Sequence, residues 1–181
     1  MVEDALLIYK LKQGHHKALQ KIYDKYKIKL LKLAIVLIGD QSTAEDIVHD
    51  VFIKFSKSAE RISMTGSLKN YLVTSVINRA RNVLRDNKRH SETSLEGADL
   101  LPSSERGPEQ WAVLSEQLTL LSRALQHLPW EQREVICLRM ELDMPFRRIA
   151  ILQGTSVNTI KGRYRYAMKK LRSLLNSEVD Q

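Results

Sequence analysis

Residues 145–175, PFRRIAILQGTSVNTIKGRYRYAMKKLRSLL, constrain the fold of this chain more than any other stretch. Gly154 follows Ala150 by four positions, and Ile160 follows Gly154 by six. A small alanine lets two helices cross closely, and a glycine can adopt the positive φ that a tight turn between crossed helices requires. This spacing predicts two helices that share one core, which is a helix-turn-helix.

The second of these helices has one apolar face and one basic face. Ser156 is a good N-cap for it. The apolar side chains recur at three- and four-residue steps, and they are Val157, Ile160, Tyr164, Ala167, Leu171 and Leu174. The opposite face is polar and basic, and it carries Asn158, Thr159, Lys161, Arg165, Tyr166, Lys169 and Lys170. A helix that enters a DNA groove shows its N-terminal polar side chains to base edges and its cations to phosphates. The alternative is an amphipathic surface helix with a solvated basic face, but such helices lack the turn spacing in front of this one.

Positive charge is concentrated towards the two ends of the sequence. Residues 1–90 hold 17 lysines and arginines against 9 acids, residues 91–126 hold 2 against 6, and residues 127–181 hold 10 against 6. Two basic blocks therefore flank an acidic middle. This distribution is typical of a protein that contacts a polyanion at two separate places.

Composition narrows the class of protein. The chain is 43% hydrophobic, 28% charged and only 6% aromatic, with few glycines and prolines, which suits an all-α fold. Cys137 is the single cysteine, so no disulfide can form within the chain, and we expect a buried thiol. Residues 1–12 do not read as a signal peptide, and the longest apolar run, residues 33–38, is too short to span a bilayer. We expect a cytoplasmic protein with no membrane span.

The first half of the chain predicts four helices. Their approximate ranges are 4–13, 15–38, 42–62 and 68–89, with breaks at Gly14, at Gly39 and in a loop at residues 62–68. Ser42 and Thr43, followed by Glu45, predict the N-cap of the third helix. Lysines crowd the outer face of the second helix, which we interpret mainly as a solvated surface.

The third predicted helix carries Asp46, His49 and Asp50 on its outer face. Two carboxylates one turn apart could belong to a metal site or an acid–base pair, but no third ligand follows at a suitable spacing. We therefore expect no metal and no cofactor, and favour a solvated face or a protein-docking surface.

The fourth predicted helix ends in a basic cluster. Its cations are Arg79, Arg81, Arg85, Lys88 and Arg89, and the amides Asn78 and Asn82 stand among them. Such a mixture offers cations for phosphates and amides for base edges.

The sequence predicts two small helical domains joined by a flexible linker. Residues 91–108 are rich in Ser, Glu, Gly and Pro and carry no helical apolar stripe, so we interpret them as a flexible acidic linker. Residues 1–90 then form the first domain, and residues 109–181, which end in the helix-turn-helix, form the second.

Four stretches, in this order, make the chain similar to the bacterial RNA polymerase sigma factors of the extracytoplasmic-function group, in the sigma-70 family. The first half contributes STAEDIVHDVFIKF and SLKNYLVTSVINRARNVLRDNKR, which resemble the helix that docks on the polymerase clamp and the promoter-melting helix. The second half contributes LPWEQREVICLRMELDMPFRRIA followed by SVNTIKGRYRYAMKKLR. The resemblance covers nearly the whole chain.

The resemblance implies a function in promoter-specific transcription initiation. The first domain would bind core RNA polymerase and hold the non-template strand of the minus-ten element, with one flipped base captured in a pocket. The second domain would place its last helix in the major groove of the minus-thirty-five element. The partners implied are core RNA polymerase, promoter DNA and an anti-sigma factor.

The resemblance also assigns roles to individual residues. Core polymerase would be bound by Asp46, His49 and Asp50. The minus-ten element would be bound by Ser63, Met64, Thr65, Gly66, Asn78, Arg79, Asn82, Arg85, Lys88 and Arg89. The minus-thirty-five element would be bound by Ser156, Asn158, Thr159, Lys161, Arg163, Arg165 and Tyr166.

Several positions depart from the family pattern. His49 stands where the family commonly has Gln, Gly162 where Ser is frequent, and Tyr166 where Arg is frequent. Arg147 and Arg148 replace a site that is often acidic, which adds positive charge near the DNA. The base preference at the minus-thirty-five element therefore does not follow from the resemblance.

Two other classes of function fit the sequence less well. A stand-alone regulator that binds an operator would use the helix-turn-helix, but it would leave the Asp46 helix and the basic helix of the first half without a role. An enzyme is disfavoured, because the chain has no Gly-rich phosphate loop, no nucleophile elbow and no HExxH motif.

Overall fold

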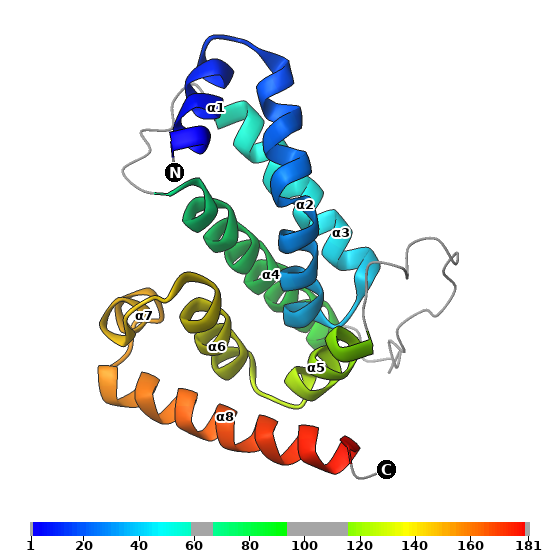
Figure 1. Cartoon of the computed structure of the whole chain (residues 1–181). Coiled ribbons are helices and arrows are strands. Elements are labelled where there is room, and N and C mark those ends of the chain that lie inside the picture. Colours follow the sequence, from blue (N-terminus) through cyan, green and yellow to red (C-terminus); the bar gives the residue numbers. More distant parts are fainter. Residues whose placement is uncertain (1, 59–66, 94–115, 180–181) are drawn as a thin grey trace.

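The computed structural model describes residues 2–58, 67–93 and 116–179, and in these residues every regular element is a helix (Figure 1). The helices are α1 (Val2–Lys12), α2 (His16–Ile38), α3 (Gln41–Ser58), α4 (Leu68–Thr93), α5 (Glu116–Gln126), α6 (Trp130–Leu142), α7 (Phe146–Leu152) and α8 (Val157–Val179). The prediction of an all-α fold is confirmed. No helix in the described part of the chain combines the length and the apolar character needed to cross a bilayer.

The first four helices pack around α2. This helix contacts α1, α3 and α4, and its Ile22 and Leu30 are fully buried at the centre of that group. Leu72 of α4 is also fully buried, and Tyr23 packs edge-to-face on Phe52 with ring centroids 4.8 Å apart. The apolar side chains of these helices therefore meet in one core.

Helices α7 and α8 form the expected helix-turn-helix, and α6 packs against both of them. Ile149 of α7 and Ile160 of α8 are both fully buried in the core that these helices share. Gly154 in the turn has a φ of +59°, and the Thr159 N–H donates to Ser156 Oγ at 3.0 Å, so both the turn glycine and the N-cap predictions are confirmed.

The two halves of the chain pack against each other. Helix α5 lies on α2, and α6 contacts both α2 and α4 (Figure 1). Three side chains of α5 and α6 donate to carbonyl oxygens in the last turn of α2. The three bonds run from Ser122 Oγ to Ile35 O (3.2 Å), from Gln126 Nε2 to Val36 O (3.0 Å) and from Arg133 Nη1 to Leu37 O (2.6 Å).

Some element boundaries differ from those expected. Asp40, not Ser42, caps α3, because the Thr43 N–H donates to Asp40 Oδ2 at 2.7 Å and the helix begins at Gln41. Helix α4 continues to Thr93, beyond the expected end at Arg89. Residues 59–66 and 94–115, which include most of the expected loop and linker, lie outside the described residues.

Candidate nucleic-acid interface

The basic helix of the first half presents one exposed stripe. Asn78, Asn82, Arg85 and Arg89 follow each other at steps of four, three and four residues, so they share one face of α4, and all four are exposed. The side chain of Lys88 and the residues Ser63, Met64, Thr65 and Gly66 lie outside the described part of the structure. The described stripe combines amides with cations, which suits contact with a nucleic-acid strand.

Arg79 points to a different side of the same helix. Its Nε and Nη2 lie 2.8 and 2.7 Å from Asp50 Oδ2 on α3, so the two residues form an ion pair between helices. The family resemblance predicts that Asp50 binds core polymerase and that Arg79 binds the minus-ten element. In this structure each of the two is the other's partner.

The outer face of α3 remains open beside that ion pair. Asp46 and His49 are exposed, and Asp50 is half-buried. Asp46 and Asp50 are one turn apart on the same face. In the described residues no group of three or more His, Cys, Asp or Glu side chains could hold a metal ion.

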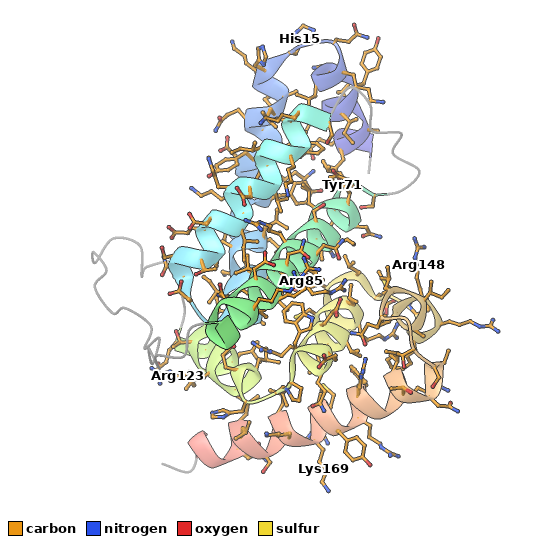
Figure 2. All side chains as sticks on the ribbon, turned by 180° about the vertical axis from the view of Figure 1, so that it is seen from behind. His15, Tyr71, Arg85, Arg123, Arg148 and Lys169 are labelled. Atoms are coloured by element: carbon orange, nitrogen blue, oxygen red, sulfur yellow. The ribbon has the colours of Figure 1, made fainter. Side chains whose placement is uncertain are left out.

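The outer face of α8 is cationic and solvent-exposed. Asn158, Lys161, Arg165 and Tyr166 are exposed on it, and the Arg165 guanidinium lies 5.3 Å from the centroid of the Tyr166 ring. Lys169 continues this face into solvent (Figure 2). Ser156 and Thr159 are also exposed, at the start of the helix, where their hydroxyl oxygens lie 2.9 Å apart.

Arg163 does not belong to that outer face. It is half-buried, and its Nη1 donates to Gln153 Oε1 at 2.6 Å. Gln153 Nε2 in turn donates to Glu134 Oε2 at 3.0 Å, and Glu134 forms an ion pair with Arg81 of α4. These four side chains border one pocket of about 320 Å³. Arg81 belongs to the basic cluster predicted from the sequence, but Glu134 and Gln153 were not predicted as its neighbours. Helical spacing relates residues that are close in sequence, whereas these residues come from helices far apart along the chain.

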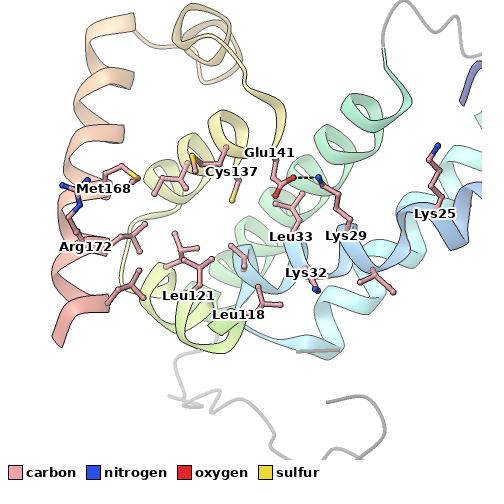
Figure 3. A pocket seen from close by; sticks show the side chains of 17 residues that line it. Lys25, Lys29, Lys32, Leu33, Leu118, Leu121, Cys137, Glu141, Met168 and Arg172 are labelled. Atoms are coloured by element: carbon pink, nitrogen blue, oxygen red, sulfur yellow. Dashed lines mark ion pairs between the residues drawn. The ribbon is translucent and has the colours of Figure 1, made fainter. Parts of the chain in front are cut away.

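A second, apolar groove lies on another side of the contact between the two halves (Figure 3). Its volume is about 940 Å³, and α2, α5, α6 and α8 line it. At its rim Lys29 Nζ forms an ion pair with Glu141 Oε2 at 2.9 Å. Cys137 lies in its wall, and burial raises the pKa of this thiol to about 12, so it is protonated at neutral pH. The expectation of a buried thiol is confirmed.

Comparison with known proteins finds one family model in each half of the chain. The family described as Sigma-70 region 2 matches residues 22–90, and the family described as Sigma-70, region 4 matches residues 118–171. The first match therefore covers the exposed stripe of α4, and the second covers the outer face of α8.

Curated relatives resemble the chain over most of its length. RNA polymerase sigma factor SigV of Bacillus subtilis is 28% identical over 153 residues, which cover 84% of this chain and 88% of SigV. The ECF RNA polymerase sigma-E factor of Escherichia coli K12 is 26% identical over 171 residues, covering 88% and 87%. The RNA polymerase sigma-H factor of Pseudomonas aeruginosa is 23% identical over 169 residues, covering 89% and 88%.

Two solved structures share the fold. The sigma factor RpoE from Bartonella quintana, in complex with the anti-sigma factor NepR, aligns with a TM-score of 0.64 and 26% identity over 87% of this chain and 98% of that one. CnrH, in complex with the cytosolic domain of CnrY, aligns with a TM-score of 0.63 and 20% identity over 97% and 98%.

The first half of the chain thus matches Sigma-70 region 2 and the second half matches region 4, in the order of their numbering. The chain belongs to the sigma-70 family of RNA polymerase sigma factors, in its extracytoplasmic-function group. As a member of this family, it acts with RNA polymerase in promoter-directed transcription initiation.

Proposed function

We propose that the exposed stripe of α4 holds the non-template strand of the minus-ten element. Asn78 and Asn82 offer amide donors and acceptors for base edges, and Arg85 and Arg89 offer cations for phosphates. Their common face on one straight helix would let successive nucleotides meet successive turns. Lys88 and residues 63–66 belong to the same proposal, although their side chains lie outside the described residues.

The same surface would stabilise an open duplex by capturing one base. Unstacking a base costs a few kcal/mol, which hydrogen bonds to its exposed edge and contacts to the flanking phosphates offset. Asn78 is the described residue with the chemistry for that edge, since it is exposed and carries both a donor and an acceptor. Arg79 would contribute through its ion pair with Asp50, by holding α4 against α3.

The outer face of α8 would read the minus-thirty-five element in the major groove. Asn158 and Thr159 lie in the first turn, where a recognition helix contacts base edges, and Lys161 and Arg165 lie where phosphates would flank the groove. Ser156 caps this helix, and Tyr166 packs beside Arg165. Arg163 would have to leave Gln153 before it could contact DNA.

The outer face of α3 would bind core RNA polymerase. Asp46 and His49 are exposed there, and the Asp50 carboxylate is shared with Arg79. Asp46 is therefore the cleaner probe of this surface, because Asp50→Ala would also release Arg79.

An anti-sigma factor would be a further partner. RpoE of Bartonella quintana was solved with the anti-sigma factor NepR, and CnrH with the cytosolic domain of CnrY. Both relatives share the fold of this chain, which is the support for extending such a partner to it.

The observation that carries the proposal is that each half presents its own exposed stripe of cations and amides, one on α4 and one on α8. Run-off transcription from a promoter library by core polymerase, with and without the protein, tests it. We expect initiation at start sites that share a two-part motif. A protein that shifts a DNA duplex alone and adds no start sites would instead be the operator-binding regulator.

Two substitutions separate the proposed roles. We expect Asp46→Ala to weaken binding of core polymerase by about threefold to tenfold, because it removes one charged contact worth about 1 kcal/mol. Asp24→Ala, which removes an exposed carboxylate from α2, is the matched control. Equal effects of the two would remove the core-binding role from α3.

Asn78→Ala should leave binding of core polymerase unchanged and reduce open-complex formation by about fivefold or more, because an amide contact to a base edge contributes about 1–3 kcal/mol. Asn87 is an equally exposed asparagine nine residues further along α4, on the opposite face, so Asn87→Ala is its control. Permanganate footprinting of the melted strand measures the effect. Equal loss of opening in both variants would contradict the assignment of the stripe.

A further inference from the structure

The described residues that line the apolar groove are different from those proposed above to bind DNA or polymerase (Figure 3). The groove's volume of about 940 Å³ lies within the range of roughly 300–1,000 Å³ that is typical of small-molecule sites. Its lining is mainly aliphatic, and it includes Leu33 of α2, Leu121 and Leu125 of α5, and Leu171 of α8. A groove of this size and chemistry suits a ligand with an apolar chain.

Large apolar side chains remain exposed at this groove. Ile28 of α2 is 53% exposed and Met140 of α6 is 67% exposed, and both line it. Apolar surface that stays exposed beside a hollow is typical of a binding site. Met168 lines the groove from α8, and the flexible methionine side chain adapts to ligands of different shapes. The groove therefore has the open and adaptable surface of a binding site.

Positive charge gathers along the α2 side of the groove. Lys25, Lys29 and Lys32 line it at steps of four and three residues, so they share one face of α2. Lys25 pairs with Asp4 at 2.8 Å, and Lys29 pairs with Glu141 at 2.9 Å. Lys32 is exposed, and within residues 2–58, 67–93 and 116–179 it has no carboxylate partner. Its ammonium group is therefore available to an anion at the edge of the groove.

A fourth lysine adds to the positive charge on this side. Lys69 of α4 is half-buried near Lys29 and Glu141. Burial, followed by the charge of Lys29, lowers the pKa of the Lys69 ammonium, and the charge of Glu141 opposes that shift. Two ammonium groups therefore share one carboxylate, which leaves a net positive charge beside the groove. Such a charge attracts an anion more strongly here than in bulk water, because the neighbouring apolar surface excludes solvent.

We propose that the apolar groove binds the anion of a long-chain fatty acid, with the acyl chain along the aliphatic lining and the carboxylate at Lys29 and Lys32. A single apolar chain with one anionic head matches a groove that is aliphatic inside and cationic along one wall. A neutral lipid would leave Lys32 without an anion, and a cationic amphiphile would meet like charge. The site goes beyond the proposed function, since it uses none of the residues assigned there.

Calorimetric titration of the full chain with decanoate, dodecanoate and tetradecanoate, each below its micelle-forming concentration, tests the proposal. We expect saturable binding of one anion per chain. Affinity should rise about tenfold for each two added carbons, because burial of each CH₂ group contributes about fourfold. Dodecanol, which has the same chain and no charge, should bind about fivefold more weakly, because it lacks the ion pairs. Equal affinities of dodecanol and dodecanoate, or no saturable binding, would overturn the proposal.

Methionine methyl resonances locate the bound chain. Met140 and Met168 line the groove, whereas Met144 is buried outside it. In protein labelled with ¹³C at the methionine methyl groups, dodecanoate should shift the resonances of Met140 and Met168 and leave that of Met144 in place. Binding that shifts none of the three, or all three equally, would place the ligand elsewhere and contradict the site.

Two matched pairs of variants test the cationic wall and the apolar lining. Lys32→Glu should weaken dodecanoate binding by about fivefold to tenfold, because it replaces attraction by repulsion. Lys27→Glu, which changes an exposed lysine of α2 outside the groove, should leave binding unchanged. Met140→Glu should weaken binding likewise, whereas Ile151→Glu should not, because Ile151 is 79% exposed on α7 outside the groove. Circular dichroism checks that each variant is folded, and equal effects within either pair would overturn the proposal.

Other anionic amphiphiles are distinguished from a free fatty acid by two further titrations. One uses vesicles of phosphatidylglycerol, and the other uses a designed acidic helix with leucines at three- and four-residue steps. If the vesicles bind the chain and dodecanoate does not, the groove faces a membrane surface and the proposal is wrong. If the acidic helix shifts the resonances of Met140 and Met168 and dodecanoate does not, the groove is a protein-docking surface and the proposal is equally wrong.

Discussion

Gly162 is a glycine within α8, on the face proposed to meet DNA. A Cβ added there would have no atom within 4 Å, and the residue has ordinary helical backbone angles. We expect Gly162→Ala to stabilise the helix by about 0.8–1 kcal/mol and to raise the melting temperature by about 2–4 °C. Binding to a minus-thirty-five duplex should weaken, because the new methyl group stands between Asn158 and Tyr166 on that face. Thermal unfolding and a duplex titration measure the two effects.

Gly154 provides the control for that substitution. It also has open space around its Cα, but its φ is +59°, which an alanine adopts only with strain. Gly154→Ala should therefore lower the melting temperature where Gly162→Ala raises it. If Gly162→Ala raises stability and leaves duplex affinity unchanged, the outer face of α8 near Gly162 does not touch the DNA.

Individual residues show what could be predicted from the sequence and what could not. The exposure of Asn78, Asn82 and Asn158 follows from helical periodicity alone, so their faces could be predicted. The pairing of Asp50 with Arg79, and the position of Arg163 beside Gln153, depend on helices packed from distant parts of the chain. Periodicity assigns a residue to a face, and only the fold decides which other helix that face meets.

Helix α1 is attached to α2 by a cluster of polar side chains. Asp4 accepts hydrogen bonds from Lys25 Nζ at 2.8 Å and from Tyr26 Oη at 2.9 Å. Burial tends to raise the pKa of the Asp4 carboxyl, but the two hydrogen bonds outweigh it and the pKa falls below its ordinary value of 3.8. Burial, followed by the bond to Asp4, raises the pKa of the Tyr26 hydroxyl to about 12.

The direction of these shifts predicts how α1 responds to pH. Because the pKa of Asp4 is lowered on folding, its contribution to stability is present above pH 3.8 and is lost as the pH falls through the lowered value. We expect α1 to exchange its amide hydrogens faster at pH 3 than at pH 5, relative to α4. Asp4→Asn should speed the exchange of α1 at pH 5 and remove this pH dependence.

The control carboxylate for this prediction is Asp24. Within the described residues it bonds the exposed Gln20 side chain one turn away on α2, so Asp24→Asn should leave the exchange of α1 unchanged at either pH. If the amide hydrogens of α1 exchange at the same rate in the Asp4→Asn and Asp24→Asn proteins, the polar cluster does not hold α1 against α2.

Helix α2 illustrates why the helices could be predicted from the sequence, whereas the way they pack on one another could not. The spacing of Ile22, Leu30 and Leu37 places them on one face of α2, and all three are fully buried. Leu31, Ile35 and Val36 lie off that face and are buried as well, since the run LLKLAIVLI is apolar almost all round. A helix that is apolar on every side is buried on every side, and here the second half of the chain supplies the second cover.

The two halves of the molecule are joined by hydrogen bonds at the end of α2. Carbonyls of the first half accept from donors of the second, so separation of the halves breaks three hydrogen bonds at once, although Ile35 O keeps its bond from the Gly39 N–H. Exchange of these bonds for bonds to water costs little net free energy for each bond, about 0.5–1.5 kcal/mol. Each of these hydrogen bonds therefore contributes only modestly to the association of the halves.

Gly39→Ala tests this coupling with a control that the chain itself provides. Gly39 and Gly14 have nearly equal φ values, +83° and +79°, so an alanine at either position carries similar backbone strain of about 1–2 kcal/mol. Only at Gly39 does the new Cβ meet another group, Gln126 Cδ at 2.8 Å. Gln126 can move away, but it then loses its bonds to Val36 O and Arg133.

We therefore expect Gly14→Ala to lower the melting temperature while the two halves still unfold in one transition. Gly39→Ala should lower it further and separate the unfolding of the halves, as followed by amide exchange of α3 and α8. The Gly39→Ala protein should also accept proteolytic cleavage between α4 and α5 more readily than the Gly14→Ala protein, because the halves no longer hold each other. Identical behaviour of the two variants would mean that the contact at Gln126 contributes nothing to the association of the halves.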